Sequence, residues 1–107
     1  MALTDSTCRP CEGDTPRLTA AEAARLHREV PAWELADERL RRRFVFRSFV
    51  DAIAFVDRVA ILAEQEGHHP DFAVHYRQVD LVLWTHAIGG LSENDFILAA
   101  KIDGLER

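Results

Sequence analysis

The stretch that constrains the fold most strongly is SFVDAIAFVDRVAILAEQEGHHP, which runs from Ser48 to Pro70. Ser48, with Asp51 three residues later, is typical of a helix N-terminus, and Gly67 favours the left-handed conformation that ends helices. The sequence therefore predicts a long helix from Ser48 to about Glu66. The exit of this helix carries two adjacent histidines followed by a proline.

The apolar residues of this helix cover more than one stripe of its surface. One face holds the residues Phe49, Ala52, Ile53, Val56, Val59, Ala60 and Ala63. Phe55, Ile61 and Leu62 lie outside that stripe. An apolar perimeter of this width predicts burial on two sides. A sheet would cover one side, and in so small a chain another subunit would cover the other.

Length and composition favour one folded domain that does not bind nucleic acid. The chain has 107 residues, of which 48% are hydrophobic, and its net charge is -5. A chain of this length is too short for two separate cores. Binding of duplex nucleic acid is not expected, because phosphate contacts need a surplus of Lys and Arg on one surface. The dense basic run at residues 39–43 has acidic neighbours, and we interpret it as a solvated hairpin.

The first sixteen residues are expected to form a flexible tail, followed by a single domain over residues 17–107. The tail lacks the apolar run of a signal peptide, and no stretch of about eighteen apolar residues suggests a membrane span. We therefore expect a cytoplasmic protein. Cys8 and Cys11 form a lone CxxC pair, which is half of a zinc site, and we interpret them as free reduced thiols.

Helix and strand signals alternate along the rest of the chain. Thr19 and Glu22 form a capping box that predicts a first helix to about residue 29, which Pro31 ends. Strand-like runs occupy residues 33–35, 43–47, 72–76 and 78–86, and Ser92 begins a last helix that continues to about residue 105. The order α-β-β-α-β-β-α predicts an α+β fold, with a four-stranded antiparallel sheet and three helices packed on one face.

A set of titratable residues falls at the ends of these elements. Its members are Glu64, Glu66, His68, His69, His86 and Asp95. Imidazoles titrate near neutral pH, so clustered histidines with a carboxylate partner suit acid/base catalysis. On the residues alone, a metal site and an incidental cluster remain alternatives. Metal is disfavoured because adjacent histidines rarely both reach one ion and no HExxH spacing is present. His27 and His75 are interpreted as solvated.

The spacing of these residues resembles the signature of the pterin-4a-carbinolamine dehydratases. The pattern is Glu64, three residues, His68-His69-Pro70, five residues, Tyr76, nine residues, His86, eight residues and Asp95. Further similarity lies at Leu18-Thr19, at Trp33, in the strand from Phe44 to Phe46 and at Gly90-Leu91-Ser92. The resemblance covers roughly residues 17–105, which leaves only the cysteine tail outside it.

The resemblance implies a hydro-lyase that needs no metal and no cofactor. Members of the family remove water from a 4a-hydroxytetrahydropterin, the product of aromatic amino-acid hydroxylases, and return quinonoid dihydropterin. By similarity, His68 and His86 would be the acid/base pair and His69 would bind and orient the pterin. Asp95 would hydrogen-bond a histidine or the substrate, Glu64 would hold His68, and Trp33 would lie beside the pterin site. As an isolated aromatic at a strand start, Trp33 is more typical of a core.

The resemblance also implies partners and an alternative function. Members of the family form homodimers by joining sheet edges, or homotetramers that also pack helices together. An aromatic amino-acid hydroxylase is the expected functional partner. The alternative is a protein-binding module, acting as a transcriptional cofactor or an assembly factor through the same fold.

Overall fold

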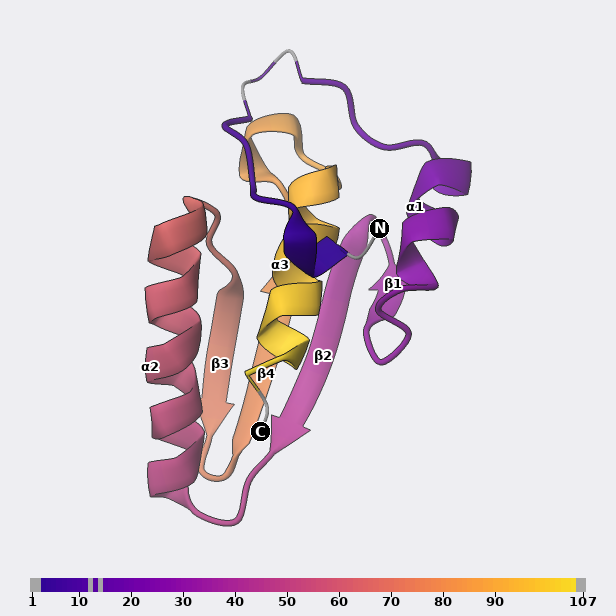
Figure 1. Cartoon of the computed structure of the whole chain (residues 1–107). Helices are drawn as coiled ribbons and strands as arrows, with labels where there is room; N and C mark the ends of the chain where they lie inside the picture. Colours follow the sequence, from indigo (N-terminus) through magenta and orange to yellow (C-terminus); the bar gives the residue numbers. More distant parts are fainter. Residues whose placement is uncertain (1–2, 12, 14, 106–107) are drawn as a thin grey trace.

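The computed structural model describes residues 3–11, 13 and 15–105. Over these residues the chain forms three α-helices and one four-stranded sheet in the order α-β-β-α-β-β-α (Figure 1). The helices are α1 (Ala20–His27), α2 (Phe49–Glu66) and α3 (Glu93–Asp103). The strands are β1 (Glu34–Ala36), β2 (Arg39–Val45), β3 (Asp71–His75) and β4 (Gln78–Leu83). The predicted α+β order is confirmed.

The sheet is antiparallel throughout, with the strands in the spatial order β1-β2-β4-β3. The β1–β2 hairpin turns through Asp37 and Glu38, and the β3–β4 hairpin turns through Tyr76; all three residues have positive φ angles. In β4 the side chains alternate, so that Val79, Leu81 and Leu83 are buried while their neighbours are partly exposed. This alternation gives the sheet one core face.

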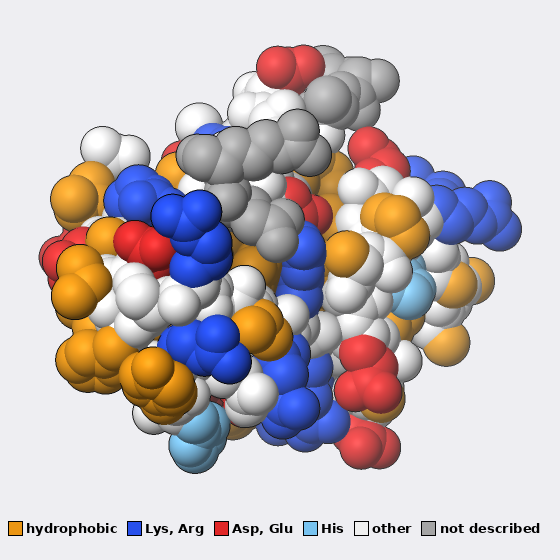
Figure 2. Space-filling view, turned by 90° about the horizontal axis from the view of Figure 1, so that it is seen from below, with side chains coloured by type: hydrophobic (Ala, Val, Ile, Leu, Met, Phe, Trp, Pro, Cys, Tyr) orange, Lys and Arg blue, Asp and Glu red, His pale blue; other side chains and the backbone are white. Residues whose placement is uncertain are grey.

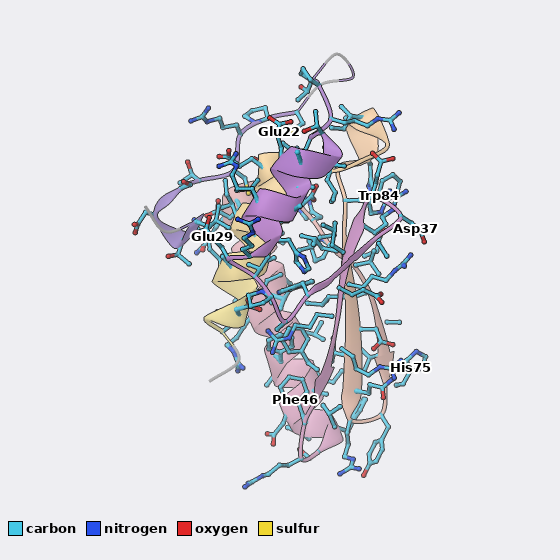
Figure 3. All side chains as sticks on the ribbon, turned by 90° about the vertical axis from the view of Figure 1, so that its right-hand side faces the viewer. Glu22, Glu29, Asp37, Phe46, His75 and Trp84 are labelled. Carbon is cyan, nitrogen blue, oxygen red and sulfur yellow. The ribbon has the colours of Figure 1, made fainter. Side chains whose placement is uncertain are left out.

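All three helices lie on one face of the sheet, as predicted, and the opposite face is uncovered (Figures 1 and 3). Local signals define the helix ends. The Thr19 capping box opens α1, and Ser48 accepts a hydrogen bond from the Asp51 amide at the start of α2. Gly67 ends α2 with a φ of 65°, a conformation that costs little only for a residue without a Cβ.

Two strand boundaries differ from the prediction. β2 begins at Arg39 rather than near residue 43, because Leu40 is buried opposite Leu83 and the arginines around it alternate with core positions. β4 ends at Leu83, and His86 lies in the short 3₁₀ turn His86–Ile88 that follows it. The basic run is therefore a paired strand, and His86 is held by a turn.

The inward face of α2 is rotated relative to the predicted stripe. Phe55 was expected outside the stripe, yet it is fully buried, whereas Phe49 is half-exposed. The reason is a group of aromatic rings: Phe55 packs on Phe44 at a centroid distance of 4.7 Å and on Phe46 at 5.0 Å. Sheet residues, which helix periodicity does not take into account, decide which face turns inward.

Part of the apolar perimeter of α2 does remain exposed. Ile61 is 60% exposed, and Leu62 is only partly buried against the core. Figure 2 shows hydrophobic side chains gathered at the left, on the side of the molecule where α2 lies. Within the described residues, no helix is long and apolar enough to cross a membrane.

Truncation of Phe55 tests the packing of α2 on the sheet. We expect Phe55→Ala to lower the free energy of unfolding by about 3–5 kcal/mol, because it leaves a cavity between two aromatic rings. Val50→Ala, at a position 73% exposed on the same helix, is the matched control and should change the value by less than about 0.5 kcal/mol. Urea unfolding measures both, and equal effects would contradict this packing.

Candidate functional site

A buried carboxylate lies at the centre of the candidate site. Asp95 is in the first turn of α3 and has no exposed surface. Its Oδ2 accepts hydrogen bonds from the Ser92 amide at 3.0 Å and from the Thr85 hydroxyl at 2.8 Å. Its Oδ1 lies 2.6 Å from His68 Nε2. Asp95 therefore joins the exit of α2, the end of β4 and the start of α3.

Asp95 determines the tautomer of His68. A carboxylate only accepts hydrogen bonds, so the 2.6 Å contact requires that His68 Nε2 carries a hydrogen. In the neutral imidazole the lone pair then resides on Nδ1. Gly67 aims the ring, and the His68 amide donates to the Ala63 carbonyl at 3.2 Å. His68 is thus held rigidly, with its side chain only 11% exposed.

His69 has a different carboxylate partner, on the surface. Its Nε2 lies 2.6 Å from Glu64 Oε2, and both side chains are mostly exposed. The implied role of Glu64 as the partner of His68 is therefore corrected. Glu64 orients His69, because the buried Asp95 already takes the Nε2 of His68.

His86 is held by an aromatic neighbour and a distant carboxylate. Its ring meets Trp84 edge-on at a centroid distance of 4.0 Å, and its Nε2 lies 3.4 Å from Asp71 Oδ2. The same Asp71 oxygen accepts the Trp84 indole hydrogen at 2.8 Å. His86 thus has a weaker partner than His68, and its side chain is half-exposed.

The three histidines line one open hollow of about 180 Å³. The other lining residues are Arg9, Cys11, Gly67, Trp84, Thr85, Ala87 and Asn94. The structure therefore brings the adjacent pair His68 and His69 together with His86 from a distant segment, and Asp95 lies directly behind His68. Trp84, at the upper end of the sheet in Figure 3, belongs to this group and was not among the predicted site residues. Its position two residues before His86 was the available signal.

Trp33, which the resemblance places beside the pterin, lies in the core away from the histidine hollow. It is 1% exposed, packs edge-on against Phe44 and donates its indole hydrogen to Asp103 Oδ1 at 2.8 Å. Trp33 is not among the residues that line the histidine hollow. It is a core residue, which was the interpretation of an isolated aromatic at a strand start.

Glu66, the second glutamate at the end of α2, forms hydrogen bonds that connect parts of the fold. Its Oε2 accepts from Lys101 Nζ at 2.8 Å, and its Oε1 accepts from the Cys8 amide at 2.9 Å. The hydrogen bond from Lys101 lowers the pKa of the Glu66 carboxyl. Glu66 thus ties α2 to α3 and to the N-terminal segment.

The titratable groups of the site form histidine–carboxylate pairs and not a cluster of metal ligands. Within the part of the chain that the structure describes, no three His, Cys, Asp or Glu side chains are grouped as metal ligands. Each site histidine has instead its own carboxylate, at 2.6 Å for His68 and His69 and at 3.4 Å for His86. Paired imidazoles of this kind can accept and release protons near neutral pH.

The chain belongs to the pterin 4 alpha carbinolamine dehydratase family, whose model matches residues 16–105. A protein of Nitrosomonas eutropha named "Putative pterin-4-alpha-carbinolamine dehydratase" is 50% identical over 96% of this chain and 92% of its own length. A protein of Halorhodospira halophila with the same name is 49% identical over 98% of both chains.

Two solved structures share the fold. One, described as a transcriptional coactivator/pterin dehydratase from Brucella melitensis, has a TM-score of 0.81 and 33% identity, and the match covers 86% of this chain and all of that one. The other is described as a pterin dehydratase-like protein that is a RuBisCO assembly factor in the alpha-carboxysome. It has a TM-score of 0.59 and 29% identity, over 69% of this chain and 86% of that one.

Replacement of Asp95 tests how much its hydrogen bonds contribute to the stability of the protein. Asp95→Asn leaves a single acceptor oxygen for three donors, and we expect the free energy of unfolding to fall by about 1–3 kcal/mol. The control is Glu64→Gln, which removes an exposed carboxylate of similar geometry and should cost less than about 0.5 kcal/mol. Chemical denaturation of both variants decides the matter; an Asp95→Asn protein as stable as the parent would refute the buried network.

Proposed function

We propose that this protein removes water from a 4a-hydroxytetrahydropterin to give quinonoid dihydropterin. The observation that supports it most is the convergence of His68, His69 and His86 on one hollow, with the buried Asp95 behind His68. Membership of the dehydratase family supports the substrate class. Recycling of the pterin after aromatic amino-acid hydroxylation, in the cytoplasm, would be its setting.

The reaction breaks one C–O bond and moves two protons. Hydroxide is a poor leaving group, so an acid protonates the 4a oxygen, which departs as water. A base removes a proton from a ring N–H, and the electron pair of that bond restores the conjugated ring system. The protein gives one proton and takes one, so its protonation is unchanged after the turnover. Two imidazoles suffice for this chemistry near neutral pH.

The different carboxylate partners suggest a division of labour. Asp95 holds the hydrogen of His68 on Nε2, which leaves Nδ1 free as a proton acceptor, so His68 suits the base. His86, whose carboxylate contact is the longer one at 3.4 Å, would then be the acid. His69, oriented by Glu64 at the exposed rim, would bind the pterin. This assignment requires no cofactor.

Histidine variants test the proposal directly. We expect His68→Ala and His86→Ala each to lower turnover of a 4a-hydroxytetrahydropterin by about 10²-fold, the usual contribution of a positioned acid or base. His75→Ala is the control, because His75 is exposed on β3 at the opposite end of the sheet from Trp84 (Figure 3). An ultraviolet assay of dehydration measures the rates.

The folded state of each variant has to be established by circular dichroism, so that a loss of activity is not a loss of structure. If both histidine variants fold and retain the turnover of the His75→Ala control, the dehydratase proposal is wrong.

A protein-binding role is the second candidate, and the exposed apolar surface favours it. Among the described residues, the exposed large hydrophobic side chains are Val45, Phe49, Val50, Ile61, Phe72 and Tyr76. Surfaces of this kind commonly mark interfaces. The relatives of known structure include one described as a coactivator and one described as an assembly factor. We propose a second copy of this chain as the first occupant, in a homodimer or homotetramer.

Light scattering at micromolar concentration tests the assembly. We expect the mass of a dimer or a tetramer, and Ile61→Glu should shift it toward the monomer because a carboxylate would be buried in an apolar contact. Ala21→Glu places the same side chain on the exposed surface of α1 and should leave the mass unchanged. A monomeric parent protein would contradict this proposal.

A further inference from the structure

The N-terminal segment from Thr7 to Cys11, here called the N-terminal wall, lies against the start of α3. Asn94, the second residue of α3, holds this segment through hydrogen bonds to both the backbone amide and the backbone carbonyl of Arg9. The Arg9 amide donates to Asn94 Oδ1 at 2.9 Å, and Asn94 Nδ2 donates to the Arg9 carbonyl. This pair copies the two hydrogen bonds that antiparallel strands exchange, so it fixes the path of the chain and not just one atom.

A second anchor precedes the first. The Cys8 amide donates to Glu66, whose other oxygen pairs with Lys101 of α3. The Cys8 thiol lies 3.6 Å from the Asn94 carbonyl oxygen, and burial, together with the charge of Glu66, raises its pKa to about 12. The wall is thus attached to both helices whose ends form the histidine site, and Cys8 is an unreactive thiol at neutral pH.

The far end of the wall reaches the histidine hollow. Asn94 Nδ2 lies 3.2 Å from Cys11 Sγ, and Cys11 Sγ lies 3.8 Å from Ser92 Oγ. Arg9 and Cys11 both line the hollow together with His68, His69 and His86. Cys11 has a solvent-exposed neighbour in Pro10 and is itself only partly buried. The wall therefore forms one side of the hollow.

We propose that the N-terminal wall closes one side of the substrate pocket and strengthens pterin binding, and that Asn94 is the positioning residue that holds it there. This inference rests on the proposed function, since it names the pterin as the ligand of the hollow. The wall precedes residue 16, where the match to the family model begins. Of the two cysteines of the predicted tail, Cys11 lines the hollow and Cys8 helps to anchor the wall.

The wall acts on binding and not on proton transfer. The acid and the base are the histidines of the α2 exit and of the turn after β4, and Asp95 is held by Ser92 and Thr85. Release of the wall removes contact surface but leaves these groups in place. Its loss should therefore raise the KM and the dissociation constant while kcat changes little, the pattern of a lost uniform binding interaction.

The first experiment is a graded substitution of Asn94 in the full-length protein. Asn94→Ala removes both hydrogen bonds to Arg9, and we expect about a tenfold rise in KM and in the dissociation constant of biopterin, a pterin with no 4a-hydroxyl to lose. Asn94→Asp keeps the acceptor for the Arg9 amide and loses the donor, so it should fall between. Glu93→Gln, at the exposed neighbouring position, is the control.

The second experiment needs neither catalysis nor a change at Asn94. In the full-length Cys8→Ser protein Cys11 is the single thiol, and saturating biopterin should slow its labelling by a thiol reagent about tenfold, because the ligand covers that side of the hollow. In the Cys11→Ser protein Cys8 is the single thiol. Adding Asn94→Ala should speed its labelling, since the wall is no longer held against α3.

The outcomes separate this inference from the proposed function. If biopterin binds the parent protein, yet Cys11 is not protected and Asn94→Ala binds as tightly as Glu93→Gln, the wall has no role in binding and the dehydratase proposal stands. If biopterin fails to bind the parent protein, the proposed function is overturned together with the pterin role of the wall. Protection of Cys11 with a raised dissociation constant in Asn94→Ala supports both.

Discussion

The contact between Asp95 and His68 is the constraint on which the site depends. A carboxylate without exposed surface is costly unless its oxygens are hydrogen-bonded. Here the three donors come from three parts of the chain: the Ser92 amide, the Thr85 hydroxyl and the His68 imidazole. Because each donor must reach Asp95 at 2.6–3.0 Å, the α2 exit, the end of β4 and the start of α3 are held in one arrangement. The same contact that satisfies the buried charge orients the imidazole.

The fold brings these three segments together by simple means. Gly67 ends α2 in a left-handed turn, so His68 leaves the helix directly toward α3. The antiparallel pairing of β3 with β4 returns the chain to the same end of the sheet, where Trp84 and His86 follow Leu83. Glu66 and Lys101 pair between α2 and α3 beside this junction. Rigid elements thus present the histidines, and His69 and His86 are more exposed than His68.

Features set by neighbours in sequence were predictable, and features set by distant contacts were not. The capping residues Thr19 and Ser48 and the stop at Gly67 predicted the helices, and the alternating runs predicted the strands. The spacing of the histidines predicted side chains that the structure places around one hollow. The prediction of the inward face of α2 was wrong at Phe55, because contacts with Phe44 and Phe46 determine which face of the helix is buried. The periodicity of the helix sequence does not reveal contacts with residues that are distant in the chain.

The carboxylate partners of the histidines show the same difference between local and distant contacts. Glu64 lies close to both His68 and His69 in sequence, yet of these two it pairs with His69, because the buried Asp95 is the partner of His68. The most direct test of the account is the tautomer of His68, read from the ¹⁵N chemical shifts of its ring at pH 9, with Asp95→Asn as the reference. The account predicts a protonated Nε2 bonded to Asp95 and an unprotonated Nδ1, and a mixture of tautomers in Asp95→Asn. A His68 with its hydrogen on Nδ1 in the parent protein would contradict it.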